Sequence, residues 1–235
     1  MKHLAVIVVF NTDAYLQKQI DLFREFVIGD IAVIDNSSDR NTPSKIKRIC
    51  TDNKIEYIKT ATYEGDFSRS HAFACNTAIN LYRKDYDSLL LCDHDIFPLK
   101  HVEIQQYDKY LLGGIHQMRK SPKFHEPNRV IYNYMWPGLL FLNTLQLKEA
   151  ELDMMPTIVS DTFLDTGGQL YKIINGNPDR ICYFEEKHME TEYGNYALIE
   201  NGWMHFLKGS NWNEDPNHEK RINHLMKILE SNIHV

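Results

Sequence analysis

The chain has 235 residues, of which 43% are hydrophobic and 25% are charged, an ordinary composition for a folded globular protein. Its formal net charge of -6 argues against a nucleic-acid-binding protein that depends on a basic surface. No stretch approaches the roughly 20 apolar residues that a membrane span needs, so we expect no span, while peripheral membrane contact stays open. The four cysteines lack CxxC spacing and the start of the chain lacks a cleavable signal pattern. We therefore expect reduced thiols and a cytoplasmic protein.

Strands and helices alternate through the first part of the chain. The apolar run 4–10 predicts a buried strand, and apolar residues with helical spacing follow over 16–27. A second buried strand is predicted at 31–34, a helix begins at Pro43, and a shorter, more polar strand covers 54–59. Alternation of this kind predicts a parallel sheet with right-handed crossovers.

Polar residues follow these strands at the edge where ligands bind in open α/β sheets. Asp35 opens a polar loop after the second strand. Ser68 or Ser70 can cap the next helix, and Arg69 and His71 lie at its start, where a helix N-terminus with two basic side chains could hold an anion. The same two residues are also compatible with a plain surface turn.

The run 88–92 predicts a strand buried on both faces, and it stops abruptly at Asp93, His94 and Asp95. Carboxylates two residues apart project to the same side of an extended backbone, where they repel each other unless a cation neutralises them. Mg²⁺ or Mn²⁺ would do so and would fill its other positions with water and diphosphate oxygens. The alternative is that these aspartates only cap the next turn.

The second part of the chain is less regular. A strand is predicted at 111–115, and 119–133 reads as a long, basic, proline-containing loop that could close over a site or be an ordinary surface loop. A buried strand is predicted at 139–142. Trp136, on the loop before it, could offer a sugar ring an aromatic platform, although a core tryptophan is the more frequent outcome.

Asp165 precedes a short predicted helix, 169–174, and is either the cap of that helix or a carboxylate presented at a site. Two short strands follow at 181–184 and 203–206, the second of which carries His205. Asp215 and Pro216 then begin a terminal helix whose apolar stripe predicts docking on the rest of the protein.

The order of these segments resembles the GT-A glycosyltransferases, especially the nucleotide-sugar enzymes of the family 2 type. The segments that carry the resemblance are VIVVFNTD, IAVIDNSSD, FSRSHAFACNTAIN, LLLCDHDIFP, YMWPGLLFLN, FLDTGG and MHFLKGSNW. The resemblance implies an α/β fold of the GT-A type, which is Rossmann-like and has a mostly parallel central sheet flanked by helices, with a C-terminal helix packed on the domain. We expect a single domain over 1–235, with a nucleotide-binding half (1–98), an acceptor-side half (99–212) and the terminal helix (213–235).

The resemblance also implies roles for individual residues. Those expected to bind the nucleotide sugar are Phe10, Asn11, Thr12, Asp35, Arg69, His71, Asp93 and Lys208. Asp93 and Asp95 stand where such enzymes carry the DxD metal motif, and His205 stands where many supply a late metal ligand. Asp165 takes the place of the catalytic base and Trp136 that of an acceptor-binding residue. The acidic dipeptide before an aromatic motif that family 2 enzymes usually show is not obvious here.

The expected function is therefore metal-dependent transfer of a sugar from a nucleoside diphosphate donor, with UDP-sugars favoured, to a hydroxyl acceptor such as a glycan. Mn²⁺ or Mg²⁺ would stabilise the charge of the leaving diphosphate, and a positioned carboxylate would take the acceptor's proton. The alternatives are a GT-A-like binding module without turnover and a nucleotidyltransferase. The latter is expected to have a glycine-rich loop that is missing after the first strand. A haloacid-dehalogenase-like phosphatase fits poorly, because Phe97 stands where that family has Thr or Val.

Overall fold

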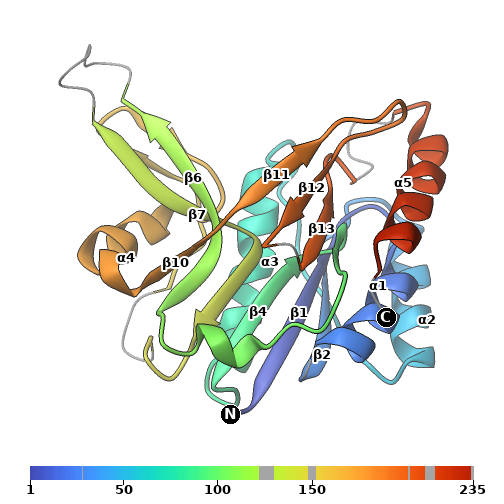
Figure 1. Cartoon of the computed structure of the whole chain (residues 1–235), viewed down its shortest axis with the longest axis horizontal. Helices are drawn as coiled ribbons and strands as arrows, with labels where there is room; N and C mark the ends of the chain where they lie inside the picture. The colour runs from blue at the N-terminus through green and yellow to red at the C-terminus, as the bar shows by residue number, and fades with distance from the viewer. Residues whose placement is uncertain (28, 122–129, 148–151, 201, 210–214, 234–235) are drawn as a thin grey trace.

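The computed structural model describes residues 1–27, 29–121, 130–147, 152–200, 202–209 and 215–233. Its main sheet has the strand order β10-β6-β7-β4-β1-β2-β3 in this described part (Figure 1). These strands are β1 (His3–Val9), β2 (Asp30–Asp35), β3 (Glu56–Lys59), β4 (Ser88–Asp93), β6 (Leu112–Lys120), β7 (Ile131–Asn143) and β10 (Ile181–Phe184). The expected alternation of strands and helices in the first part of the chain is confirmed.

The main sheet is mostly parallel, as expected. Strands β3, β2, β1 and β4 pair in parallel, and so do β10 and β6, whereas β7 pairs antiparallel with both β4 and β6. The mixed α/β fold with a mostly parallel central sheet is therefore confirmed by the strand pairing itself. Strand β7 joins the two parallel parts.

Strands β6 and β7 are longer than the sequence predicts. Together they extend beyond the main sheet as a two-stranded arm, at the upper left of Figure 1, with Lys120 opposite Ile131. The prediction of a loop over 119–133 was therefore wrong at both ends, where the chain is extended and paired. Residues 122–129 of that predicted loop, with Lys123 and Arg129, lie outside the described residues.

Helices cover both faces of the parallel strands, which explains why β1 is apolar at every position from Leu4 to Val9. Side chains alternate between the two faces of a strand. Ile7 and Val9 pack with α1 (Leu16–Phe26) and α2 (Thr42–Asp52), whereas Val6 and Val8 pack with α3 (Phe67–Tyr82). The main sheet is thus the middle layer between two layers of helices (Figure 1).

A smaller sheet follows directly from the Asp93–Asp95 segment. It has the order β11-β12-β13-β5, with β11 (Glu186–Met189), β12 (Tyr196–Ile199), β13 (Trp203–Phe206) and β5 (Ile96–Pro98). In the antiparallel pair β13 and β5, His205 is opposite Ile96. This pairing brings a late segment of the chain beside the end of β4.

The terminal helix α5 (His218–Asn232) packs on the domain, as expected, and lies beside the smaller sheet in Figure 1. Its buried Leu225 and Leu229 contact a cluster that includes Tyr15 and Phe206. The helix begins two residues later than predicted, because Asp215 precedes the cap residue and forms an ion pair with Arg221 at 2.9 Å.

The remaining elements of the described chain are the hairpin of β8 (Thr157–Val159) and β9 (Thr162–Leu164), three 3-10 turns and α4 (Tyr171–Gly176). The turns are η1 (Ile104–Tyr107), η2 (Gly168–Leu170) and η3 (Pro178–Arg180). Asp165 is not the cap of α4, whose cap residue is Leu170. The cap of α3 is Asp66, whose carboxylate accepts from the Arg69 amide at 2.9 Å, so the prediction of Ser68 or Ser70 as its cap was wrong.

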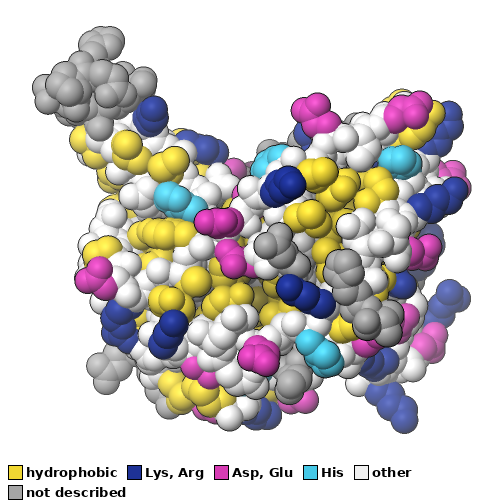
Figure 2. Space-filling view, in the orientation of Figure 1, with side chains coloured by type: hydrophobic (Ala, Val, Ile, Leu, Met, Phe, Trp, Pro, Cys, Tyr) yellow, Lys and Arg dark blue, Asp and Glu magenta, His cyan; other side chains and the backbone are white. Residues whose placement is uncertain are grey.

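The described surface carries charges of both signs. On the face in Figure 2, described Lys and Arg side chains are interspersed with Asp and Glu. Among the described residues, no helix has the length and apolarity that crossing a bilayer requires. The four cysteines carry free thiols, and three of them are buried.

Candidate functional site

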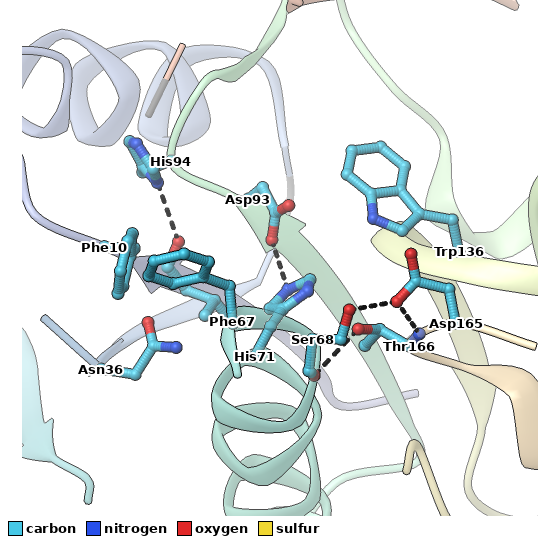
Figure 3. A pocket seen from close by; sticks show the side chains of 11 residues that line it. Phe10, Asn36, Phe67, Ser68, His71, Asp93, His94, Trp136, Asp165 and Thr166 are labelled. Carbon is cyan, nitrogen blue, oxygen red and sulfur yellow. Dashed lines mark hydrogen bonds and ion pairs between the residues drawn. The ribbon is translucent and has the colours of Figure 1, made fainter. Parts of the chain in front are cut away.

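A cavity of about 470 Å³ opens at the carboxyl ends of β1 and β4, beside the first turns of α3 (Figure 3). The side chains that line it come from both halves of the chain: Val8, Phe10, Asn36, Phe67, Ser68, His71, Asp93, His94, Trp136, Asp165 and Thr166. We call this the first cavity. Its position is the one at which open α/β sheets bind ligands.

Asp93 and His71 form an ion pair in this cavity, with 2.8 Å between Asp93 Oδ1 and His71 Nε2. Burial lowers the pKa of His71, but the Asp93 carboxylate outweighs it and holds that pKa well above the usual value. Burial likewise raises the pKa of Asp93, but His71 outweighs it and the pKa is lowered. The pair is therefore an imidazolium and a carboxylate that neutralise each other.

Asp95 has a different environment from Asp93, although only His94 separates them. It is 4% exposed, and burial together with the charge of Asp93 raises its pKa well above the usual value. Among the described residues, the basic group paired with it is His205, with 3.8 Å between Asp95 Oδ1 and His205 Nε2. Burial lowers the pKa of His205 to about 4, so this imidazole is neutral and keeps a free lone pair.

His94 points away from the two aspartates. Its Nδ1 lies 3.3 Å from the Val8 carbonyl oxygen and its ring stacks on Tyr15, with 6.0 Å between the ring centroids. Burial lowers the pKa of His94 to about 4. His94 and Asp95 form a turn after β4, so the extended-strand alternation ends at Asp93. Asp93 and His94 line the first cavity, whereas Asp95 does not.

The expected metal ligands do not form a complete site from protein groups alone. In the part of the chain that the structure describes, no three His, Cys, Asp or Glu side chains are arranged to hold one ion. Asp93 is engaged by His71, whereas Asp95 Oδ1 is buried without a hydrogen-bond donor. A carboxylate and a neutral imidazole of this kind suit Mn²⁺ or Mg²⁺ when a ligand's diphosphate supplies further oxygens.

Asp165 lies on the opposite wall of the first cavity. Its Oδ1 accepts hydrogen bonds from the Ser68 hydroxyl and from the Thr166 amide, the latter at 2.7 Å. The Thr166 hydroxyl donates in turn to the Ser68 carbonyl oxygen at 2.9 Å. Gly167 follows with φ of 83°, and a Cβ there would lie 2.0 Å from the Met135 carbonyl oxygen. Only glycine lets this turn pack against β7.

A second cavity of about 290 Å³ adjoins the first and shares Trp136, Asp165 and Thr166 with it. Its other lining residues are Ile115, Gln117, Arg119, Tyr134, Glu186, His188, His205 and Leu207. Both hydrogen-bond donors and acceptors are present among them. Because Asp165 lines both cavities, it lies at their common wall.

Trp136 separates the cavities and belongs to β7, so the prediction that it lies on a loop was wrong. Its indole stacks on the His205 ring, with 5.0 Å between centroids and 28° between planes. Gly138 lies against the same indole, where a Cβ would be 2.1 Å from its ring carbons. Trp136 is thus held by its neighbours, and its stacking fixes the plane of His205.

The residues expected to bind the nucleoside are only partly at the first cavity. Phe10 lines it and meets Phe67 edge to face, with 5.6 Å between centroids (Figure 3). Asn11, at φ of 51°, accepts from the Ser38 amide at 2.7 Å and so fixes the loop after β2. Thr12 is buried, and its hydroxyl accepts from the Ala14 amide.

Asp35 is fully buried and does not line either cavity. Its Oδ1 accepts from the Ser37 amide and its Oδ2 accepts from the Tyr57 hydroxyl, both at 2.8 Å. The neighbouring Asn36, which the sequence does not single out, lines the first cavity instead. The nucleoside role of Asp35 stays a prediction.

The two remaining basic residues lie outside both cavities. The Arg69 side chain is exposed, with Nε 4.0 Å from Asp66 Oδ2 and the guanidinium over the Tyr63 ring. Lys208 is exposed and has φ of 61°. Of the quoted segment after β13, residues 210–212 lie outside the described residues. The diphosphate roles of Arg69 and Lys208 stay predictions.

Sequence reasoning missed Ser68 and Thr166 as partners of Asp165, as well as Glu186 and His188 in the second cavity. Ser68 was considered only as a helix cap. Glu186 and His188 alternate along one strand, which would have placed them on one face had β11 been predicted. No sequence pattern signals the contact of α3 with Asp165.

No protein-family model and no curated protein matches the chain. Solved structures to which it is similar include a mannosyltransferase from Pyrobaculum calidifontis in complex with GDP-Man and Mn²⁺, at 14% identity and a TM-score of 0.48. That likeness covers 77% of this chain and 54% of the mannosyltransferase chain, so this chain spans about half the length of its relative.

Two further solved structures are similar to this chain at comparable identity and TM-score. Staphylococcus aureus TarS in complex with UDP-GlcNAc is 15% identical, with a TM-score of 0.46 over 80% of this chain and 57% of that chain. A putative glucose-1-phosphate thymidylyltransferase from Bacillus anthracis is 10% identical, with a TM-score of 0.48 over 95% of both chains. The structural neighbours thus include glycosyltransferases of the GT-A type. Likenesses this distant do not say what this chain binds.

Proposed function

We propose that the chain is a metal-dependent glycosyltransferase that moves a sugar from a nucleoside diphosphate donor, with UDP-sugars favoured, to a hydroxyl of a glycan acceptor. The observation that carries the proposal is the position of Asp165 at the wall shared by two adjoining cavities. A base that takes a proton from an acceptor must lie within hydrogen-bond reach of the acceptor hydroxyl, and that hydroxyl must lie beside the reacting carbon of the donor.

The donor would occupy the first cavity. Phe10 and Phe67 offer apolar ring edges for a nucleobase at one end, and Asn36 offers an amide that can both donate and accept hydrogen bonds. The Asp93–His71 pair is at the inner wall, beside the carboxyl end of β4. The proposed order of the donor's parts along the cavity is therefore nucleobase, diphosphate and sugar, with the sugar next to Asp165.

Asp95 and His205 would hold a divalent cation, Mn²⁺ or Mg²⁺, beside the diphosphate. Asp95 supplies a buried oxygen that has no donor among the described residues, and the stacked, neutral His205 supplies nitrogen. When bound, the cation stabilises the negative charge of the leaving diphosphate. Asp93 lies in the same region, with its charge neutralised and its orientation fixed by His71.

The acceptor would enter the second cavity, and its hydroxyl would meet Asp165. The cavity presents the carboxylate of Glu186, the amide of Gln117 and the cation of Arg119. Groups of both signs suit a neutral glycan, whose hydroxyls donate as well as accept hydrogen bonds, better than a ligand of one charge. As the acceptor oxygen attacks, Asp165 takes its proton, a step worth about 10²- to 10⁴-fold in rate.

The proposal includes one domain over 1–235, with a donor half (1–98), an acceptor half (99–212) and the terminal helix. It also includes a cytoplasmic location, which the four free thiols favour.

Titration calorimetry tests the donor class. UDP-, GDP- and dTDP-sugars are titrated into the wild-type protein with and without Mn²⁺, and into Asp95→Ala as the metal-site variant. We expect one nucleotide sugar to bind with Mn²⁺, and Asp95→Ala to lose that metal dependence. If the affinity for the nucleotide sugar is the same with and without Mn²⁺ and in Asp95→Ala, the metal assignment is contradicted.

Product formation separates transfer from binding alone. Asp165→Asn keeps the shape of the side chain and removes its basicity, so we expect donor affinity to be kept and transfer to fall by about 10²-fold or more. If the wild-type protein binds a nucleotide sugar but forms no product with any glycan, the chain is a binding module. Release of pyrophosphate from a nucleoside triphosphate and a sugar phosphate would indicate a nucleotidyltransferase instead.

A further inference from the structure

Ser68 joins the first turn of α3 to Asp165 across 97 residues of sequence. Its hydroxyl donates to Asp165 Oδ1, and both side chains line the first cavity (Figure 3). A serine in the first turn of a helix commonly serves the helix itself by accepting from free amides. Asp66 already does that for α3, so the Ser68 hydroxyl is available for another role.

The two oxygens of Asp165 are in different situations. Oδ1 accepts from both the Ser68 hydroxyl and the Thr166 amide. In Figure 3 the second oxygen points away from these donors, on the side of Trp136. Trp136 forms the wall between the two cavities, so the second oxygen faces the junction at which the proposed donor and acceptor would meet.

Ser68 is itself held in place from the other direction. Its carbonyl oxygen accepts from the Thr166 hydroxyl at 2.9 Å, so α3 and the segment after β9 are joined by hydrogen bonds that run both ways. The terminal torsion of an aspartate is soft, and a carboxylate without such partners turns over a broad range. Fixing one oxygen with two donors therefore fixes the direction in which the other presents its lone pairs.

We propose that Ser68 is a positioning residue that orients Asp165 for proton abstraction, an inference that rests on the proposed function. Ser68 holds Oδ1, and the second oxygen takes the proton of the acceptor hydroxyl. The acceptor oxygen forms a bond to the anomeric carbon as the bond from that carbon to the diphosphate oxygen breaks. The electron pair of the broken bond leaves on the diphosphate, and the proton stays on Asp165.

The test compares steady-state kinetics of the wild-type protein with Ser68→Ala, Ser68→Thr and Ser44→Ala. Ser44 is the matched control, because it is also a first-turn serine, in α2, and within the described part of the chain its hydroxyl bonds only to the Asn41 carbonyl oxygen. We expect Ser68→Ala to lower kcat roughly 10- to 100-fold, the value of a hydrogen bond to a charged group. The KM and Kd for the donor stay within about twofold, because the lost contact orients the base and does not bind the nucleotide.

Two further readouts distinguish positioning from a merely structural role. Ser68→Thr keeps a hydroxyl and restores kcat to within about threefold of the wild-type value, and Ser44→Ala leaves it unchanged. In an Asp165→Asn background, Ser68→Ala causes no further loss, because Ser68 acts through Asp165. Equal losses in both backgrounds, or a raised donor KM with unchanged kcat, would overturn the proposal.

Activity of the wild-type protein distinguishes failure of the proposed function from failure of the role of Ser68. If the wild-type protein forms no product, the proposed function is contradicted, and the role of Ser68 with it. If the wild-type protein is active and Ser68→Ala has normal kcat, only the role of Ser68 is contradicted.

Discussion

Gln19 is the buried side chain that holds the turn carrying the two candidate site aspartates. It lies on α1 and is fully buried, and its Nε2 donates to the Asp93 carbonyl oxygen at 2.8 Å and to the Ile96 carbonyl oxygen at 2.7 Å. Replacing it with methionine, which has a similar shape and no donor, removes both bonds. We predict a loss of stability together with a loss of order at the turn.

The size of the loss follows from the groups left unpaired. Two carbonyl oxygens lose the Gln19 amide and keep the weaker Cys92 thiol as a donor, at a cost of about 2 kcal/mol each. Gln19 Oε1 is itself buried without a partner in the described structure, and its removal returns about 2 kcal/mol. The net destabilisation is therefore about 2 kcal/mol, which lowers Tm by roughly 4–8 °C for a chain of this size.

Calorimetric unfolding of Gln19→Met beside Gln17→Met measures this effect. Gln17 lies two residues earlier on the same helix but is exposed, and its hydrogen bonds are on the surface. We expect its variant to change stability by no more than about 0.5 kcal/mol. If both variants shift Tm equally, the Gln19 amide does not hold the turn and the reasoning is refuted.

Three other changes have outcomes that the structure predicts. Gly138→Ala places a Cβ 2.1 Å from the Trp136 indole, so it should cost about 1–3 kcal/mol in chemical unfolding and lower transfer. Gly176→Ala, with open space at the Cβ, is its control and should be neutral or slightly stabilising. Leu229→Ala removes a fully buried contact of α5 and should cost about 2–5 kcal/mol, whereas the exposed Lys227→Ala should cost little. Burial raises the pKa of Asp39, but the amides of Thr42 and Asn41 outweigh it and lower that pKa. Because a lowered pKa adds stability above the unfolded value of about 3.9, Asp39→Ala should cost about 1 kcal/mol at pH 7 and progressively less below that value, which urea unfolding at pH 7 and pH 3 would measure. A difference between the Asp39 variant and the wild type that stays constant with pH would contradict this assignment.

The first part of the fold could be predicted because its strands are buried on both faces. Continuous apolar runs such as those of β1 and β4 predict buried strands, and the helix between β1 and β2 has clear helical periodicity. The second part could not be predicted to the same extent. Its strand β7 is 13 residues long and includes Pro137 and Gly138, which normally mark a loop.

The candidate site could likewise be predicted only in part. The end of a buried strand identified Asp93 and Asp95 as residues at a ligand-binding edge, and the structure places Asp93 in the first cavity. Which histidine faces each carboxylate depends on α3 and β13, and no local pattern specifies those contacts. Asp35 illustrates the limit, because its place at a strand end predicts exposure to a ligand, whereas the Tyr57 hydroxyl and the Ser37 amide occupy its oxygens.

The bond between Ser68 and Asp165 also bears on when the chain becomes competent during its own synthesis. The two residues are 97 positions apart, and the loop between them must close before the bond can form. Strands β1 to β4 can pair as soon as they emerge, because translation is slow compared with local folding. Residues of the first cavity that come early, such as Phe10 and His71, are therefore assembled while Asp165 is still missing. A ribosome-bound chain whose first 98 residues have emerged would present eight of the eleven described residues that line the first cavity and none of the proposed proton-transfer chemistry.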